Sequence, residues 1–209
     1  MNANAKINAE IKPLFAEPVM IADLSGVLSQ SDIQYIQSIK LVQNRTNYIS
    51  EDLYIFDHPQ LKHLKKAVQG ALDQYASEVL GITQKLYPTQ SWTLMNPPGA
   101  GMHGHSHSNS IISGSFYYAP LIEPVASMIF SRSNSYQQIE LPPTDDRRSI
   151  FNTPMHQVKP QTGQLILFSS ALQHLVEPNM GTQPRHSIAF NTFIKGKIGD
   201  YRDVSELKL

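Results

Sequence analysis

The first forty residues show one short apolar run and one helical repeat. Residues 18–21 (PVMI) are compatible with an early strand. Ser31 and Asp32, which are residue types that often begin helices, precede Ile33, Ile36 and Ile39 at three-residue spacing. This pattern predicts a short amphipathic helix that starts near Ser31.

A longer apolar stripe follows between about residues 59 and 80. Asp57 is a candidate N-cap, Pro59 suits a first helical turn, and Gly81 is a typical helix stop. Between them, the stripe consists of Leu61, Leu64, Val68, Leu72, Tyr75 and Val79. Apolar residues at this spacing occupy one face of a helix. We therefore expect a second helix that packs this face against a sheet, and a helical region of about residues 28–81.

After about residue 86 the apolar runs become short and are separated by proline and glycine. The predicted strands are 91–95, 111–118, 127–131, 165–168 and 187–194. Several short strands without intervening helices are typical of a sandwich or barrel. The pattern predicts a mainly β fold with helices (α+β), formed by a single domain over residues 1–209 with its β core at about 86–196.

Composition and charge exclude several functional classes. Lysine plus arginine and aspartate plus glutamate both number 17, so the chain has no basic excess of the kind that nucleic-acid binders carry. No apolar run approaches the ~20 residues of a membrane span, and the N-terminus has no apolar signal core. We expect a cytoplasmic protein without nucleic-acid or membrane partners. Because the chain contains no cysteine, any metal site must use nitrogen and oxygen ligands.

Three of the eight histidines stand at alternate positions in the stretch HGHSHSN. In a strand, His103, His105 and His107 would point to the same side. Imidazole is the commonest metal ligand among protein side chains. A metal site and a polar, histidine-rich loop explain this stretch equally well.

The stretch 163–191 supplies further polar groups next to predicted strands. His174 follows the apolar strand 165–168 after a short loop. On the last strand, Arg185 and Ser187 share a face with Ala189 and Asn191. A guanidinium fork beside a hydroxyl is suited to bind a carboxylate. Considered alone, an arginine at this position usually forms an ordinary surface salt bridge.

Taken in order, these segments resemble the iron(II)- and 2-oxoglutarate-dependent dioxygenase superfamily, and most closely the 2-oxoglutarate–iron oxygenases of phages and marine bacteria. The shared outline is W…N…G…H-x-H-x-N-S…S-G-x-x-Y, then P-x-x-G-x-L-x-L-F-x-S…H-x-V-x-P-N…R-x-S-x-A-F-N. The matching positions are Trp92, Asn96, Gly99, His105, His107, Asn109, Ser110, Ser113, Gly114, Tyr117, Pro160, Gly163, Leu165, Leu167, Phe168, Ser170, His174, Val176, Pro178, Asn179, Arg185, Ser187, Ala189, Phe190 and Asn191. The resemblance is dense over about residues 90–194, and KPLFAEPV near residue 15 is similar to the family's opening. H-x-H alone is a weak signal, whereas the ordered set is specific.

The resemblance implies a double-stranded β-helix (jelly roll) backed by the N-terminal helices. It implies Fe(II) as the metal, held by His105, His107 and His174, with no catalytic residue beyond the metal centre. The cosubstrate would be 2-oxoglutarate, with its distal carboxylate on Arg185, Ser187 and Tyr117. The implied activity couples oxidative decarboxylation of 2-oxoglutarate to hydroxylation of an unidentified small molecule or peptide. A homodimer is compatible with this expectation.

The ligand assignment leaves alternatives open. The usual site has two histidines and one carboxylate, whereas His107 stands at the carboxylate position and leaves the metal with one more positive charge. Zinc with three histidines is a known catalytic arrangement, so the sequence does not fix the metal. The ligand pair could instead be His103 and His105, although we expect His103 at the rim. Tyr117 could be an ordinary core aromatic.

Two other functions compete with the oxygenase. A cupin-type enzyme with three histidines would use no oxoacid and would leave Arg185 without a role. A jelly-roll binding module without catalysis would not require the filled ligand positions. Finally, residues 132–154 are polar, contain charges of both signs and lack apolar periodicity. We expect this segment to form a lid over the site, and a surface loop without a role is the alternative.

Overall fold

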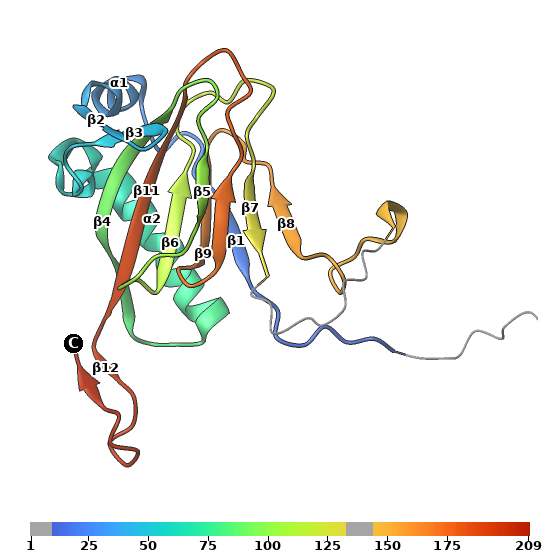
Figure 1. The fold of residues 1–209 in the computed structure, drawn as a ribbon. Coiled ribbons are helices and arrows are strands. Elements are labelled where there is room, and N and C mark those ends of the chain that lie inside the picture. The colour runs from blue at the N-terminus through green and yellow to red at the C-terminus, as the bar shows by residue number, and fades with distance from the viewer. Residues whose placement is uncertain (1–9, 133–143) are drawn as a thin grey trace, which may run out of the picture.

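In the computed structural model, which describes residues 10–132 and 144–209, two antiparallel sheets face each other (Figure 1). In spatial order the larger sheet contains β1 (Val19–Asp23), β9 (Gln164–Ser169), β6 (Ile112–Phe116), β11 (Arg185–Lys195), β4 (Lys85–Asn96), β3 (Asn47–Ser50) and β2 (Leu41–Asn44). The smaller sheet contains β5 (Met102–His105), β10 (Gln173–Val176), β7 (Met128–Ser131) and β8 (Met155–Val158). A short hairpin of β12 (Lys197–Ile198) and β13 (Leu207–Lys208) projects from the body. The expected jelly roll, a double-stranded β-helix with helices, is confirmed.

Both predicted helices are present, with different starts. Helix α1 (Gln30–Ser38) is capped by Ser29, whose side chain and that of Asp32 form a reciprocal capping box, so the helix begins before Ser31. After the 3₁₀ turns η1 (Ile55–Asp57) and η2 (Pro59–Leu61), α2 (Lys62–Tyr75) continues into the π-turn η3 (Ala76–Leu80). Gly81 ends it in the left-handed conformation. Asp57 does not cap α2, because the helix begins at Lys62 with Leu61 at its N-cap; the Asp57 carboxylate pairs with Lys65 instead.

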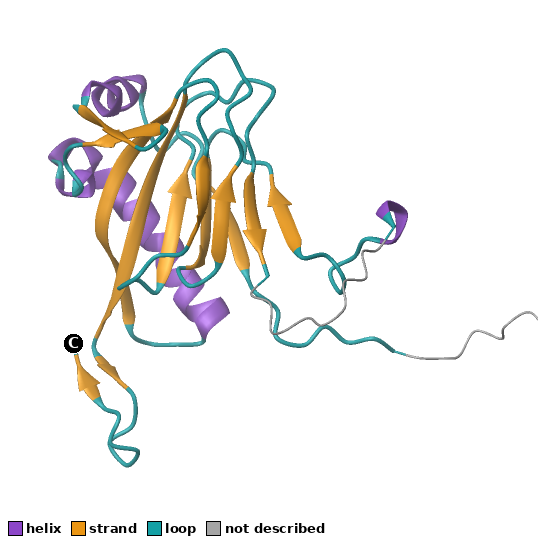
Figure 2. Cartoon of the chain, in the orientation of Figure 1, coloured by secondary structure: helices purple, strands orange, loops and turns teal. Residues whose placement is uncertain are grey.

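The larger sheet buries apolar side chains on both faces. Helix α2 lies across its outer face (Figure 2), where Val68 and Leu72 pack in one cluster with Leu165 and Leu167 of β9. The alternate residues of the same strand, Ile166 and Phe168, join a second cluster with residues such as Phe130 of the facing sheet. This alternation is the period-two pattern of a strand. The core therefore consists of a helix–sheet layer and a sheet–sheet layer, and the inside of the second layer holds the site described below.

The sequence pattern did not predict the short strands β2, β3, β5, β8 and β10 or the C-terminal hairpin of β12 and β13. The expected lid connects β7 to β8, and its residues 133–143 lie outside the described residues. In the described remainder, which includes η4 (Asp145–Arg147), the Arg132 guanidinium donates to the carbonyl of Ile150 at 3.0 Å. No residue of 144–154 lines the cavity described below, and the lid stays a prediction. Within the described part of the chain, no helix is long and apolar enough to cross a membrane.

Candidate metal centre

The smaller sheet brings two histidines directly opposite each other. His105 ends β5 and His174 lies in β10, and the two are partners in the antiparallel pairing. Side chains of such partners lie side by side, and these two rings have centroids 4.4 Å apart. His107 follows two residues after β5, and its ring stacks on that of His174 at 5.2 Å. One nitrogen from each of the three rings lies within 4.8 Å of the others.

The loop after β5 is what carries His107 to this position. Its backbone N–H donates to the carbonyl of Ser170 at 2.9 Å, which ties the loop to the end of β9. Asn109 then turns the chain with φ of 55°, a left-handed conformation that asparagine tolerates better than most residues. The hydroxyl of Ser170 contacts those of Ser110 at 2.7 Å and Ser113 at 2.8 Å. This serine cluster fixes the loop against the larger sheet.

Hydrogen bonds to the backbone orient two of the three rings. Nδ1 of His105 lies 2.8 Å from the carbonyl oxygen of His103, and Nδ1 of His174 lies 2.9 Å from that of Leu172. A carbonyl only accepts, so Nδ1 carries the proton in both rings and Nε2 presents its lone pair to the site. Burial lowers the pKa of both His107 and His174 to about 4. Both rings are therefore neutral near pH 7, the form that binds metals.

His103 lies at the rim and does not join the three-histidine group. Its ring accepts a hydrogen bond at Nε2 from the Arg45 guanidinium at 2.9 Å. Its carbonyl, in contrast, orients His105. The geometry thus favours the ligand set His105, His107 and His174 over the pair His103 and His105.

A cavity of about 420 Å³ opens next to the histidines, a size common for ligand pockets. Arg185, Ser187 and Ala189 of β11 line it from one strand face, as the alternation predicts. Asn191, expected on the same face, does not line it, because the register of β11 shifts between Phe190 and Thr192. Its side-chain oxygen accepts from Ser113 instead.

Arg185 is buried and incompletely paired. It is 7% exposed, and its Nη2 donates to the Tyr117 hydroxyl at 3.1 Å, while its Nε has no hydrogen-bond partner among the described residues. Tyr117 is fully buried between the sheets and does not line the cavity. Arg185 and Ser187 therefore line the cavity, whereas the Tyr117 hydroxyl contacts the Arg185 guanidinium.

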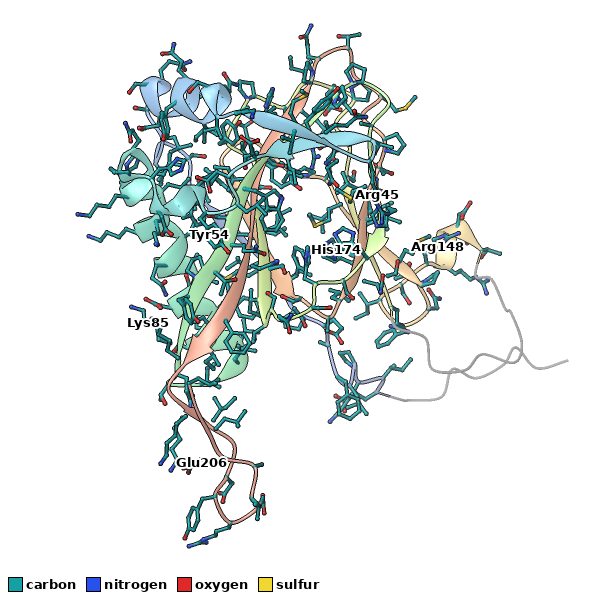
Figure 3. All side chains as sticks on the ribbon, turned by 60° about the vertical axis from the view of Figure 1, so that its left-hand side comes forward. Arg45, Tyr54, Lys85, Arg148, His174 and Glu206 are labelled. Carbon is teal, nitrogen blue, oxygen red and sulfur yellow. The ribbon has the colours of Figure 1, made fainter. Side chains whose placement is uncertain are left out.

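The residues that line the cavity are suited to bind a divalent transition metal and an anion. Metal–nitrogen bonds of about 2.1 Å allow two ligands of one ion to lie up to about 4.2 Å apart, so small side-chain rotations would complete the site. The described lining contains Arg45 and Arg185 but no aspartate or glutamate. A metal held here keeps its full charge, since all three ligands are neutral, and an anionic ligand would offset it. In Figure 3, His174 is seen on the inner side of the larger sheet, with Arg45 nearby.

Several lining residues were not anticipated from the sequence. Trp92, the only tryptophan, forms part of the cavity wall, as do Ser115 and the β2–β3 hairpin that carries Arg45. Trp92 stands two positions from Leu94 on β4, and Leu94 also lines the cavity. The alternation within β4 could therefore have placed Trp92 on the inner face. No pattern in residues 41–50 indicates that their hairpin reaches the site.

Comparisons with known proteins agree with this description. Residues 90–191 match the family model described as "Putative 2OG-Fe(II) oxygenase". No curated protein matches the chain in sequence.

Solved structures share the fold at low sequence identity. A Trichoplax adhaerens prolyl hydroxylase, solved with a hypoxia inducible factor peptide, has 14% identity and a TM-score of 0.60, covering 84% of this chain and 83% of its own. A Pseudomonas putida prolyl-4-hydroxylase has 14% identity and a TM-score of 0.58, covering 86% and 94%. HygX from Streptomyces hygroscopicus, solved with nickel, 2-oxoglutarate and hygromycin B, has 12% identity and a TM-score of 0.57, covering 84% and 82%.

The matched segment contains most of the cavity lining. It begins on β4 before Trp92 and ends on β11 after Ser187, so it includes the three clustered histidines and Arg185. The part of the chain that is similar to the 2OG-Fe(II) oxygenase family is therefore the part that contains the three clustered histidines and Arg185.

Proposed function

We propose that this chain is a non-haem Fe(II) dioxygenase that couples oxidative decarboxylation of 2-oxoglutarate to hydroxylation of a second substrate. The observation that supports this most directly is Arg185. It is a buried guanidinium that pairs with no carboxylate among the described residues, and it lines the same cavity as the three histidines. A buried charge without a counter-ion is costly, so an anionic ligand is the natural partner.

In this proposal His105 and His174, whose rings are oriented by backbone carbonyls, hold the metal through Nε2, and His107 is the third ligand. Fe(II) bound there would supply the redox chemistry with dioxygen that oxidises both 2-oxoglutarate and the substrate. Arg185 binds the distal carboxylate of 2-oxoglutarate through its free donors, and the Ser187 hydroxyl adds a further hydrogen bond. Tyr117 keeps the guanidinium aimed at the cavity.

The other lining residues exclude water and position the substrate. Trp92, Leu94, Phe168 and Val176 give the cavity mostly apolar walls. Apolar walls around a redox centre restrict solvent access and so limit side reactions. When 2-oxoglutarate is bound at Arg185, the substrate binds in the remaining part of the cavity.

A cupin-type enzyme with three histidines and no oxoacid is the competing function. It would explain the metal ligands but would leave the buried Arg185 without an anion. Zinc in place of Fe(II) is a second alternative, because three histidines also suit a catalytic zinc. Requirements for Fe(II), dioxygen and 2-oxoglutarate separate these three functions.

The test follows release of labelled carbon dioxide from 2-oxoglutarate labelled at C1. We expect slow release without added substrate, dependent on both Fe(II) and dioxygen. Release should be lost in His174→Ala and strongly reduced in Arg185→Ala. Arg202→Ala, which removes an exposed arginine of the C-terminal hairpin, is the matched control. Unchanged release by Arg185→Ala, or release supported equally by zinc, would contradict the proposal.

A further inference from the structure

The β2–β3 hairpin forms an outer wall of the metal cavity. Asn44, Arg45, Asn47 and Ile49 line the cavity together with the three histidines. The hairpin lies N-terminal to residues 90–191, so it is outside the segment that carries the family match. Its tip is attached to the segment just before β5, because the Thr46 hydroxyl donates to the carbonyl of Gly101 at 2.9 Å. The tip is therefore held in place beside the metal centre.

Arg45 occupies a turn position whose backbone conformation favours glycine or asparagine over arginine. Its φ of 48° is left-handed, a conformation in which glycine or asparagine is favoured and most other residues cost about 1 kcal/mol or more. The turn between β2 and β3 is only two residues long, the type in which glycine and asparagine dominate. Local strain of this kind often accompanies a functional side chain.

The Arg45 guanidinium has no carboxylate partner among residues 10–132 and 144–209. Its contacts there are the two ring nitrogens of His103, at 2.9 and 3.3 Å. Because guanidinium is always charged and the described lining has no acidic residue, the mouth of the cavity is positive. With a divalent metal and the 2-oxoglutarate dianion offsetting each other, Arg45 remains available for a second anion.

The neighbouring wall defines the rest of the ligand. Ile49 of the hairpin and its β4 neighbours Trp92 and Leu94 supply apolar lining to the cavity, and Asn44 and Asn47 line it as well. A ligand that fits this surface has an apolar body and an anionic end.

We propose that Arg45 selects a substrate that carries a carboxylate or a phosphate on an apolar body. The anionic group binds the Arg45 guanidinium at the rim, and the apolar body lies along Ile49 and Trp92 toward the metal. This inference rests on the proposed function, whose own cosubstrate binds separately at Arg185. The hairpin thereby sets the substrate class, while β10 and β11 supply the metal and cosubstrate sites.

The experiment uses phenylacetate and phenyl phosphate as probes and uncharged phenylacetamide as their control. Each is titrated into the full chain loaded with Zn(II) and saturating 2-oxoglutarate, and the fluorescence of Trp92 reports binding. The variants are Arg45→Gly, Arg45→Lys and, as a control outside the cavity, Arg202→Ala. Arg45→Gly is the most informative, because glycine accepts a φ of 48° and so removes the guanidinium while relieving the strain.

We expect at least one anionic probe to bind the wild type, with phenylacetamide at least about tenfold weaker, since ion-assisted hydrogen bonds are the stronger ones. Arg45→Gly should weaken that probe about tenfold or more while its melting temperature stays equal or rises. Arg45→Lys should be intermediate, and Arg202→Ala should match the wild type. Preference for phenylacetate or for phenyl phosphate identifies which anion the rim selects.

Three results would overturn the inference: neither anion binds, phenylacetamide binds as well as the anions, or Arg45→Gly binds them like the wild type. Failure of the proposed function is read separately, from the 2-oxoglutarate titration of the wild type. If 2-oxoglutarate does not bind, the probes are titrated into the protein with Zn(II) alone, and the same three results decide the role of Arg45.

Discussion

Replacing Arg185 with methionine should separate cosubstrate binding from stability. Methionine keeps an extended side chain of similar reach while it removes the buried charge. In the wild type, Arg185 is 7% exposed and its Nε has no hydrogen-bond partner among the described residues. Without an anion, this residue is a net cost to the folded protein, because desolvating a charge costs several kcal/mol unless it is paired.

The substitution should weaken 2-oxoglutarate binding strongly but should leave the stability of the ligand-free protein unchanged or higher. Removing one partner of a buried charge pair costs about 2–5 kcal/mol of binding, so the Kd for 2-oxoglutarate should rise about 30- to 5,000-fold. The unfolding free energy of the ligand-free variant should instead stay within about 1 kcal/mol of the wild type or increase, since apolar replacement of buried charges is often neutral or stabilising. At 100 times the wild-type Kd, 2-oxoglutarate should stabilise the wild type by about 2.7 kcal/mol and the variant by about 0.9 kcal/mol at most.

Two measurements on the Zn(II)-loaded protein test this reasoning. Calorimetric titration gives the Kd for 2-oxoglutarate, and denaturant unfolding with and without 2-oxoglutarate gives the stabilities. Arg185→Lys, which keeps the charge but not the fork, should recover only part of the affinity. An unchanged Kd in Arg185→Met would remove β11 as the cosubstrate site. A loss of more than about 3 kcal/mol in the ligand-free variant would show that Arg185 is mainly structural.

Three further predictions concern the ligands, the cavity and the packing behind it. The variants His105→Ala, His107→Ala and His174→Ala should each abolish Co(II) binding, measured by visible absorption. His103→Ala should weaken this binding about 10- to 100-fold at most. If His103→Ala abolishes binding and His107→Ala does not, the ligand pair is His103 and His105 instead. Because the only tryptophan lines the cavity, Co(II) should quench the Trp92 fluorescence of the wild type but not of His174→Ala, and equal quenching of both would place the metal elsewhere. Gly114→Ala should lower the unfolding free energy by about 1–3 kcal/mol, since its Cβ would lie 2.2 Å from the Phe190 ring. Gly70→Ala on α2, where a Cβ meets open space, should raise the unfolding free energy by about 0.5–1 kcal/mol. Denaturant unfolding of both variants checks this.

Sequence patterning predicted the strands that bury apolar side chains and missed the strands that bury ligands. β9 and β11 carry strong apolar runs and were predicted within two residues of their ends. β5 and β10 are four residues long and direct His105 and His174 inward, so their apolar pattern is interrupted at the functional positions. Such local contradictions between pattern and fold are expected at functional sites.

Some residues of the candidate site could likewise be predicted from the sequence, and others could not. The face shared by Arg185 and Ser187 followed from alternation along one strand. Tyr117, expected to bind the cosubstrate, follows the end of β6, and its hydroxyl contacts Arg185, so its role in cosubstrate binding stays a prediction. Arg45 could not be predicted, because the contact between Arg45 and His103 joins residues 58 positions apart through the pairing of β3 with β4. Long-range placement of this kind depends on sheet order, which local patterns do not encode.

Anaerobic titration of the full chain with Fe(II) and 2-oxoglutarate tests the central claim most directly. When 2-oxoglutarate chelates Fe(II) at His105, His107 and His174, a weak visible charge-transfer absorption should appear only with both components present. It should be absent in His107→Ala and should require a much higher 2-oxoglutarate concentration in Arg185→Met. If the wild type binds Fe(II) but shows no such absorption at saturating 2-oxoglutarate, the chain is not a 2-oxoglutarate-dependent oxygenase.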